Sequence, residues 1–180
     1  MGRRKLVSDG RVLERALSVL ADGGGERFTL ARVAEAAGVA APTLLQRFQS
    51  KSGLLLAAFA YANAWLRPWL DERQDLDIPA LLGELSAGLS DREPFGDHLT
   101  FLREGLANPA LAALARGRMT MIHGALTARL TGPAADRAAT ADLIESHWHG
   151  AVLHWSIRPQ GRLSTHVERA LRELMGRIGG

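Results

Sequence analysis

The side chains best suited to bind a metal or to move a proton are the six histidines. Three of them, His147, His149 and His154, lie close together in the sequence. On a helix, His147 and His154 would share a face, but seven residues of helical rise separate them by about 10 Å. Zinc ligands on one helix are usually three or four residues apart, and no acidic residue stands at such a spacing from His147 or His154. We therefore expect no metal site.

The alternative chemistry is general base catalysis by His98, His123 or His147 in a small all-helical enzyme. The motifs that accompany such chemistry are missing: the chain has no G-x-S-x-G and no H-E-x-x-H. The glycines at 23–25 follow a predicted helix, whereas a nucleotide-binding loop follows a strand. We expect no catalytic residue and no cofactor, with a helical enzyme or a helical ligand-binding or interaction protein as the alternative.

Composition narrows the class of protein further. The chain has 180 residues, of which 47% are hydrophobic, and no cysteine. Disulfides, thiolate zinc sites and cysteine nucleophiles are thereby excluded, which fits a cytoplasmic protein. The longest apolar run, 54–62, is too short to cross a bilayer, and the basic N-terminus is not followed by the apolar stretch of a signal peptide. We expect a cytoplasmic protein without a membrane partner.

Charge is distributed unevenly along the chain. Residues 1–55 carry nine Lys or Arg against five acidic residues, whereas the remainder is slightly acidic, and the total is +3. An excess of positive charge in one segment suggests a negatively charged partner, most often nucleic acid. A surface of mixed charge with a small imbalance explains the same numbers, so charge alone does not decide.

The elements that must position these residues are all helices, because apolar residues recur at helical spacing throughout and no stretch alternates with the period of a strand. Glycine, proline and capping residues mark the breaks between them. The expected fold is all-α, with a domain at 1–55 and a helical domain at 56–180. The nine expected helices cover 9–21, 29–37, 42–48, 51–66, 79–89, 95–107, 109–130, 134–157 and 163–178.

The second and third of these helices are short and separated by a tight turn. Ala34 is small enough for one helix to cross closely over the other, and Gly38 can adopt the left-handed conformation that ends a helix. Val39 and Leu44 would fill the angle between the helices. This spacing predicts a helix-turn-helix, with an ordinary helical hairpin as the alternative.

The stretch FTLARVAEAAGVAAPTLLQRFQSKSGLL, residues 28–55, resembles the N-terminal domain of TetR-family transcriptional regulators. The resemblance is carried by Thr29, Ala34, Gly38-Val39, Thr43-Leu44, Phe48, Ser50-Lys51 and Leu54-Leu55. It implies a ligand-responsive repressor that binds a pseudo-palindromic operator in double-stranded DNA as a homodimer. The chain departs from the family pattern at Ala40, Pro42, Leu45 and Arg47, and Leu45 replaces a tyrosine that commonly touches a phosphate.

The second helix of the motif is expected to enter the major groove. Gln46 can pair with adenine, and alanine and threonine methyl groups can contact thymine methyl groups. The expected base readers are Ala40, Ala41, Thr43 and Gln46, and the expected phosphate contacts are Thr29, Arg47 and Lys51. Arg3 and Arg4 would act as a basic arm, with a solvated tail as the alternative.

The last two expected helices carry apolar stripes at helical spacing, which could form a four-helix interface with a second copy. The expected interface residues are Trp148, Val152, Trp155, Val167, Leu171 and Leu174. Packing of the stripes within one chain is the alternative.

The resemblance also implies a small-molecule pocket between the helices of the C-terminal domain, for an apolar or aromatic effector. The candidate lining residues are Trp65, Trp69, Phe95, His98, Phe101, Met119, Met121, His123 and His147. Each of these side chains could instead belong to the core.

Overall fold

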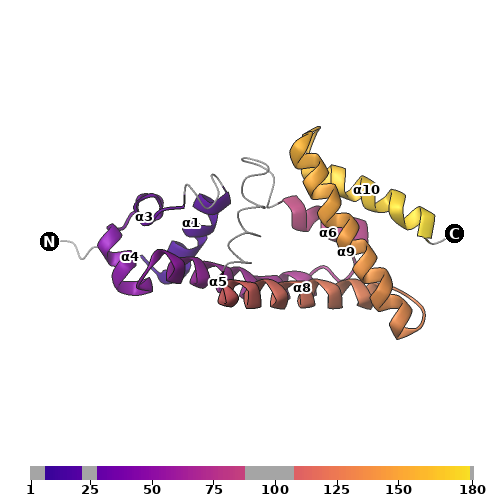
Figure 1. Cartoon of the computed structure of the whole chain (residues 1–180), viewed down its shortest axis with the longest axis horizontal. Coiled ribbons are helices and arrows are strands. Elements are labelled where there is room, and N and C mark those ends of the chain that lie inside the picture. The colour runs from indigo at the N-terminus through magenta and orange to yellow at the C-terminus, as the bar shows by residue number, and fades with distance from the viewer. Residues whose placement is uncertain (1–6, 22–27, 88–107, 179–180) are drawn as a thin grey trace. The chain divides into compact units, whose positions relative to one another are not determined.

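The computed structural model describes residues 7–21, 28–87 and 108–178, which form eight α-helices and no strand (Figure 1). The helices are α1 (Asp9–Ala21), α3 (Leu30–Ala37), α4 (Ala41–Phe48), α5 (Lys51–Asp71), α6 (Ile78–Ala87), α8 (Pro109–Arg129), α9 (Ala134–Ile157) and α10 (Leu163–Ile178). The all-α prediction is confirmed. The helix expected at 95–107 lies outside the described residues.

The chain divides into two compact units. The first comprises the described residues within Met1–Trp65 and Gly96–Ala115, and the second comprises those within Leu66–Phe95 and Arg116–Gly180. The domain boundary expected after residue 55 falls inside α5, because the apolar side chains of this helix serve both cores in turn. Leu54 and Leu55 are buried in the first unit, and Leu66 and Leu70 in the second.

Helix α5 is longer than the sequence predicted, because it continues through Pro68 to Asp71 instead of ending near residue 66. A proline inside a helix removes one backbone hydrogen bond and costs about 3 kcal/mol. Leu66 and Leu70, on either side of it, are both buried, and burying a leucine contributes about 1.5–3 kcal/mol. The two burials together outweigh the cost of the proline.

The core of the first unit lies among α1, α3, α4 and the first half of α5. Phe28, Val33 and Leu44 are fully buried there, together with Val12 of α1. Helix α1 packs on α3, and α3 packs on α4. Tyr61 of α5 ties this unit together at its edge, since its hydroxyl donates a 2.8 Å hydrogen bond to Glu14 of α1.

The core of the second unit is formed by apolar faces of longer helices, and α10 packs against both α6 and α9 (Figure 1). A buried polar pair crosses it: the Trp148 indole N–H donates to Ser86 Oγ at 2.8 Å, and the Ser86 hydroxyl donates to the Leu82 carbonyl at 2.7 Å. Both polar side chains are thus satisfied inside the core.

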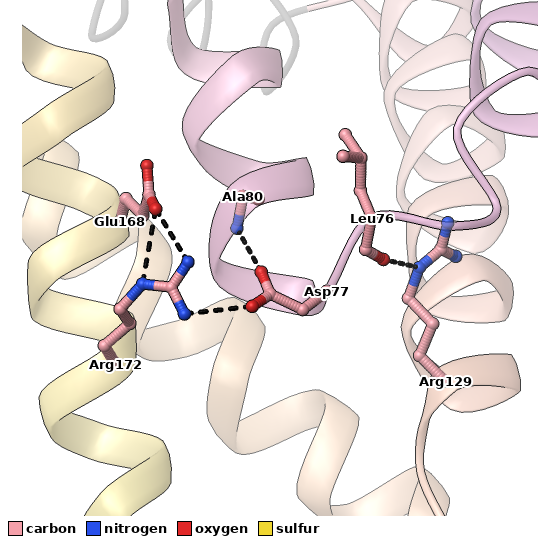
Figure 2. Close-up of polar contacts among 6 residues, drawn as sticks. All are labelled: Leu76, Asp77, Ala80, Arg129, Glu168 and Arg172. Atoms are coloured by element: carbon pink, nitrogen blue, oxygen red, sulfur yellow. Dashed lines mark hydrogen bonds and ion pairs between the residues drawn. The ribbon is translucent and has the colours of Figure 1, made fainter.

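Two arginines fix the start of α6 (Figure 2). Arg172 of α10 bonds Glu168 at 2.7 Å and Asp77 at 2.9 Å, while Asp77 accepts the backbone N–H of Ala80 in the first turn of α6. Arg129 at the end of α8 donates to the Leu76 carbonyl at 2.9 Å. The segment between α5 and α6 is therefore held to α8 and α10 by charged hydrogen bonds.

Candidate nucleic-acid interface

Helix α3 begins where the sequence predicted, because Thr29 caps it. The Thr29 hydroxyl oxygen accepts the backbone N–H of Arg32 at 3.2 Å, and the residue has the extended backbone of an N-cap. Thr29 is exposed, so its hydroxyl proton remains available to an acceptor outside the chain. Its predicted role as a phosphate contact is compatible with its role as a cap.

The turn between α3 and α4 depends on Gly38, which has φ 68°. This left-handed conformation is the one that glycine adopts without a steric cost. The Val39 N–H donates to the Ala34 carbonyl at 2.9 Å, which closes the turn. Ala34 is 4% exposed, so a larger side chain would have no space there. The predicted helix-turn-helix is present, and Ala34, Gly38 and Val39 form its turn.

The outward face of α4 coincides in part with the one predicted. Leu44 is fully buried, and Leu45 and Gln46 are exposed together with Pro42. Ala41 and Thr43, which were predicted to face DNA, are only half-exposed, and Ala41 packs against the core. With Ala40 at the exposed N-cap, we define the reading face as Ala40, Pro42, Leu45, Gln46 and Gln49.

Arg47, a predicted phosphate contact, makes two polar contacts within the chain. One of its Nη atoms donates to the Val7 carbonyl at 2.8 Å and to Asp9 Oδ1 at 3.1 Å. Its side chain is only 18% exposed. The guanidinium therefore ties the end of α4 to the segment that begins α1, and its charge is partly offset by the Asp9 carboxylate.

The junction between α4 and α5 contains a requirement that the sequence did not reveal. Gln49 ends α4 with φ 67°, and Ser50 caps α5 by accepting the Gly53 N–H at 2.9 Å. A Cβ added to Gly53 would lie 2.1 Å from the carbonyl oxygen of Phe48. No side chain fits at position 53 with this backbone. A glycine within the first turn of a predicted helix was the only signal available.

The remaining predicted DNA contacts are in part outside the described residues. Lys51 is exposed at the first position of α5, where the partial positive charge of a helix N-terminus also favours phosphate. Arg3 and Arg4 lie outside the described ranges.

The predicted ligand residues do not gather in one described site. Trp65 is 61% exposed and meets the Tyr61 ring edge-on, with ring centroids 6.1 Å apart. Trp69 is half-buried, and the guanidinium carbon of Arg73 lies 4.2 Å from the centroid of its ring. Met119 and Met121 are half-buried, and Met121 packs against the second core. Phe95, His98 and Phe101 lie outside the described residues.

The two remaining ligand candidates have other surroundings. The His123 Nδ1 atom lies 3.1 Å from Glu145 and 3.4 Å from Asp142, so it joins α8 to α9. Burial raises the pKa of the Glu145 carboxyl, and the charge of His123 opposes that rise. His147 is exposed on the outer side of α9.

Five of the six predicted dimer residues are inside the chain's own core: Trp148, Val152, Trp155, Val167 and Leu171. Their stripes pack within one chain and offer no surface to a second copy. Leu174 is half-buried and lines a groove of about 530 Å³ on the other side of α9 and α10. His154 and His166 stack across this groove with their ring centroids 5.9 Å apart.

Two further findings bear on the class of protein. Within the described ranges, no three histidine, cysteine or acidic side chains are placed to hold a metal ion. Among the same residues, no helix combines the length and the apolar character needed to cross a bilayer.

Comparison with known proteins agrees with this geometry. Residues 12–58, which contain the helix-turn-helix, match the family described as bacterial regulatory proteins, tetR family. No curated protein sequence matches the chain.

Several solved structures share the fold of nearly the whole chain. A transcriptional regulator from Rhodococcus sp. Rha1 is 20% identical, with a TM-score of 0.71 over 94% of this chain and 97% of that one. The regulator FadR from Bacillus subtilis, solved with stearoyl-CoA, is 18% identical, with a TM-score of 0.59 over 91% and 96%. The multidrug binding protein EbrR, solved with proflavin, is 19% identical, with a TM-score of 0.59 over 91% and 97%. The helix-turn-helix and the family match that covers it lead to one assignment: residues 12–58 form a DNA-binding domain of the tetR family of bacterial regulatory proteins, and nearly the whole chain shares the fold of these regulators.

Proposed function

We propose that this chain is a DNA-binding transcriptional regulator that represses transcription as a homodimer and leaves its operator when a small apolar or aromatic effector binds. The observation that carries the proposal is the helix-turn-helix at α3 and α4, whose reading face is exposed while its opposite side is buried. The family that residues 12–58 match is one of regulatory proteins, and the chain is not an enzyme. Binding to bacterial DNA implies a cytoplasmic location.

The reading face supports a mixed polar and apolar readout. The Gln46 amide can pair with the N6 and N7 atoms of adenine, and Leu45 can contact the methyl group of thymine. Both side chains are exposed on α4. We expect the operator half-site to contain A·T pairs at the positions that these two residues reach.

DNA binding is tested by selecting duplexes from a random library with the wild-type protein. A regulator enriches one pseudo-palindromic sequence and binds it with a steep dependence on salt concentration. Gln46→Ala should relax one base position per half-site, while Gln74→Ala, an exposed glutamine of the second unit, should leave the selected sequence unchanged. Selection of no sequence by the wild type would contradict the proposal.

Dimerisation is proposed for the outer side of α9 and α10. Exposed residues on α9 recur at Leu143, His147, Gly150, His154 and Ile157, which is a helical stripe opposite the buried one. A two-fold dimer through these faces would supply two reading heads, as a pseudo-palindromic operator with half-sites about 34–36 Å apart requires.

The dimer is tested by analytical ultracentrifugation of Ala170→Glu, because Ala170 lines the groove and is half-buried there. A larger, charged side chain at the centre of this contact should shift the protein to a monomer and lower operator affinity. Ala139→Glu, on an exposed part of α9 outside the groove, is the control. A dimer unaffected by Ala170→Glu would move the interface elsewhere.

An effector of large apolar or aromatic character is supported by the compounds bound to two proteins of the same fold, stearoyl-CoA in FadR and proflavin in EbrR. The half-buried Trp69 and Met119 of the second unit are the described side chains best suited to such a ligand. A thermal-shift panel that includes both compounds tests the proposal, because a ligand that binds only the folded protein raises its Tm. An effector should also release the selected duplex.

A further inference from the structure

We propose that Arg47 is a positioning residue for DNA reading, which sets the orientation of α4 through Val7 and Asp9 and does not itself contact phosphate. The inference rests on the proposed DNA-binding function and adds a residue role to it. It replaces the role that the sequence suggested for the same side chain.

The recognition helix α4 has little to hold it in place by itself. It has eight residues, and isolated helices of this length are unstable in water. Its N-cap, Ala40, makes no side-chain hydrogen bond, and Leu44 is its only buried residue. Ala41 and Phe48 are partly buried against the same core, but these non-directional apolar contacts leave the helix free to rotate or tilt unless a second, polar contact fixes it.

Arg47 supplies that second contact from the opposite end of the helix. Its Nη atom bonds the Val7 carbonyl at 2.8 Å and Asp9 at 3.1 Å, and these partners lie 40 and 38 residues earlier in the chain. Val7 itself packs against the first core. Arg47 thus connects the end of α4 to the start of α1, which contacts the core through Val12 and Ala16.

The same bonds remove Arg47 from the set of phosphate contacts. A guanidinium is attractive to phosphate when it is exposed and its charge is not already paired. The Arg47 side chain is 18% exposed and is paired with Asp9. The helical register also separates it from the reading face, because the exposed Leu45 and Gln46 lie on the other side of α4.

The two roles predict different behaviour of the salt dependence. A lost phosphate contact lowers the slope of log affinity against log salt concentration by about 0.9 per contact. A lost positioning contact leaves that slope unchanged and lowers affinity for the selected operator alone. Asp9→Ala also distinguishes them, because removing a carboxylate cannot weaken a phosphate contact but does remove the partner of Arg47.

The experiment measures binding of Arg47→Ala, Asp9→Ala and the double variant to the duplex that the wild type selects, and to a duplex of unrelated sequence. Measurements are made well below the Tm of each variant. Each single change should weaken operator binding by on the order of tenfold, and the double variant should be no weaker than Arg47→Ala, because the residues act as one unit. Binding to the unrelated duplex and the salt slope should remain as in the wild type.

Lys51→Ala and Arg15→Ala are the controls. Lys51 stands exposed at the start of α5, and its loss should lower the salt slope as expected for a phosphate contact. Arg15 is an exposed arginine of α1, and its loss should change neither the slope nor the ratio of operator to unrelated affinity. A lower slope for Arg47→Ala together with no effect of Asp9→Ala would overturn the proposal. So would a lowered Tm in both variants with unchanged operator affinity, since that is the result of a structural role only. Selection of an operator by the wild type tests the proposed function separately, whatever the variants do.

Discussion

Helices α3 and α4 of the first unit have eight residues each, whereas α9 and α10 of the second have 24 and 16. A short helix buries few side chains, so its place depends on particular backbone and polar contacts. A long amphipathic helix is placed by a stripe of apolar side chains. The two units therefore contrast a region fixed by individual contacts with a region fixed by a shared core.

The difference also separates two arginine–aspartate pairs. Arg47 and Asp9 in the first unit join a short helix to α1 through a side chain that is 18% exposed. Arg172 and Asp77 in the second are 52% and 53% exposed, between helices whose core already holds them. We therefore expect an arginine–aspartate pair to contribute more to holding a helix in place where that helix buries less apolar surface.

The largest loss of stability is expected at Gly53. If individual contacts fix the first unit, a single added methyl group there should disrupt it. In Gly53→Ala the new Cβ would meet the Phe48 carbonyl oxygen at 2.1 Å. The backbone between α4 and α5 must move to relieve this contact, and we expect a loss of roughly 2 kcal/mol or more in unfolding free energy. Urea denaturation measures the loss, and operator binding should fall with it.

The matched control in the second unit is Gly124→Ala on α8. Nothing lies within 4 Å of a Cβ at that position, and alanine favours a helix over glycine by up to about 1 kcal/mol. The variant should be equal to or more stable than the wild type. Equal losses at both glycines would remove the contrast between the units.

The next effect is expected inside the second core, at the buried polar contact between α6 and α9. Ser86→Ala leaves the buried Trp148 indole N–H without the acceptor that it has at 2.8 Å. An unsatisfied buried donor costs about 1–3 kcal/mol. Ser156→Ala is the control, because the buried Ser156 hydroxyl bonds only the Val152 carbonyl of its own helix, and its loss leaves no donor stranded. If Ser156→Ala lowers the free energy of unfolding as much as Ser86→Ala does, the hydrogen bond from the Trp148 indole contributes nothing to stability.

The sequence predicted best those features that depend on local backbone chemistry. The left-handed Gly38 follows from which groups a helix end leaves unpaired, and it is present as expected. The caps at Thr29 and Ser50 depend on the same local chemistry. The positions of most helices follow from apolar periodicity, which is also a local property of the sequence. These features need only a few consecutive residues to form.

Contacts between distant residues could not be predicted in this way. Periodicity identified the apolar stripe of Trp148 and Val152, but it cannot say whether a stripe meets its own chain or a second copy. The Arg47 bond to Val7 joins residues 40 apart, and only the packed arrangement of α1 and α4 brings them together. The exposed Leu45 was recognised as a departure from the family but not as part of the reading face.

A smaller effect is expected for Arg172→Ala, which tests the exposed pair of the comparison. Exposed ion pairs contribute little because solvent screens them and both side chains lose freedom. The variant should lose less stability than Ser86→Ala, and the loss should disappear at high salt, where screening is strongest. Urea denaturation at low and high salt makes the measurement. A loss that persists in high salt would show that the Arg172 stem packs against α6, and the pair would then resemble that of Arg47.

The smallest effect concerns pH and the groove between α9 and α10. Burial lowers the pKa of His166, as do the charges of Arg169 and His154, while Glu173 raises it. The Arg169 guanidinium can only donate, and it lies 3.3 Å from His166 Nδ1, so this contact requires an unprotonated Nδ1. A histidine whose folded pKa is lowered binds protons more readily when unfolded. Stability should therefore be complete above the pKa of an unfolded histidine, about 6.5, and should fall as pH drops through that value toward the lower folded pKa.

Thermal unfolding of wild type and His166→Gln between neutral and mildly acidic pH gives the comparison, and the variant should show the shallower decline. Arg169→Gln should give an intermediate slope, because the contribution of burial remains. A decline of equal steepness in His166→Gln would assign the pH dependence to other groups.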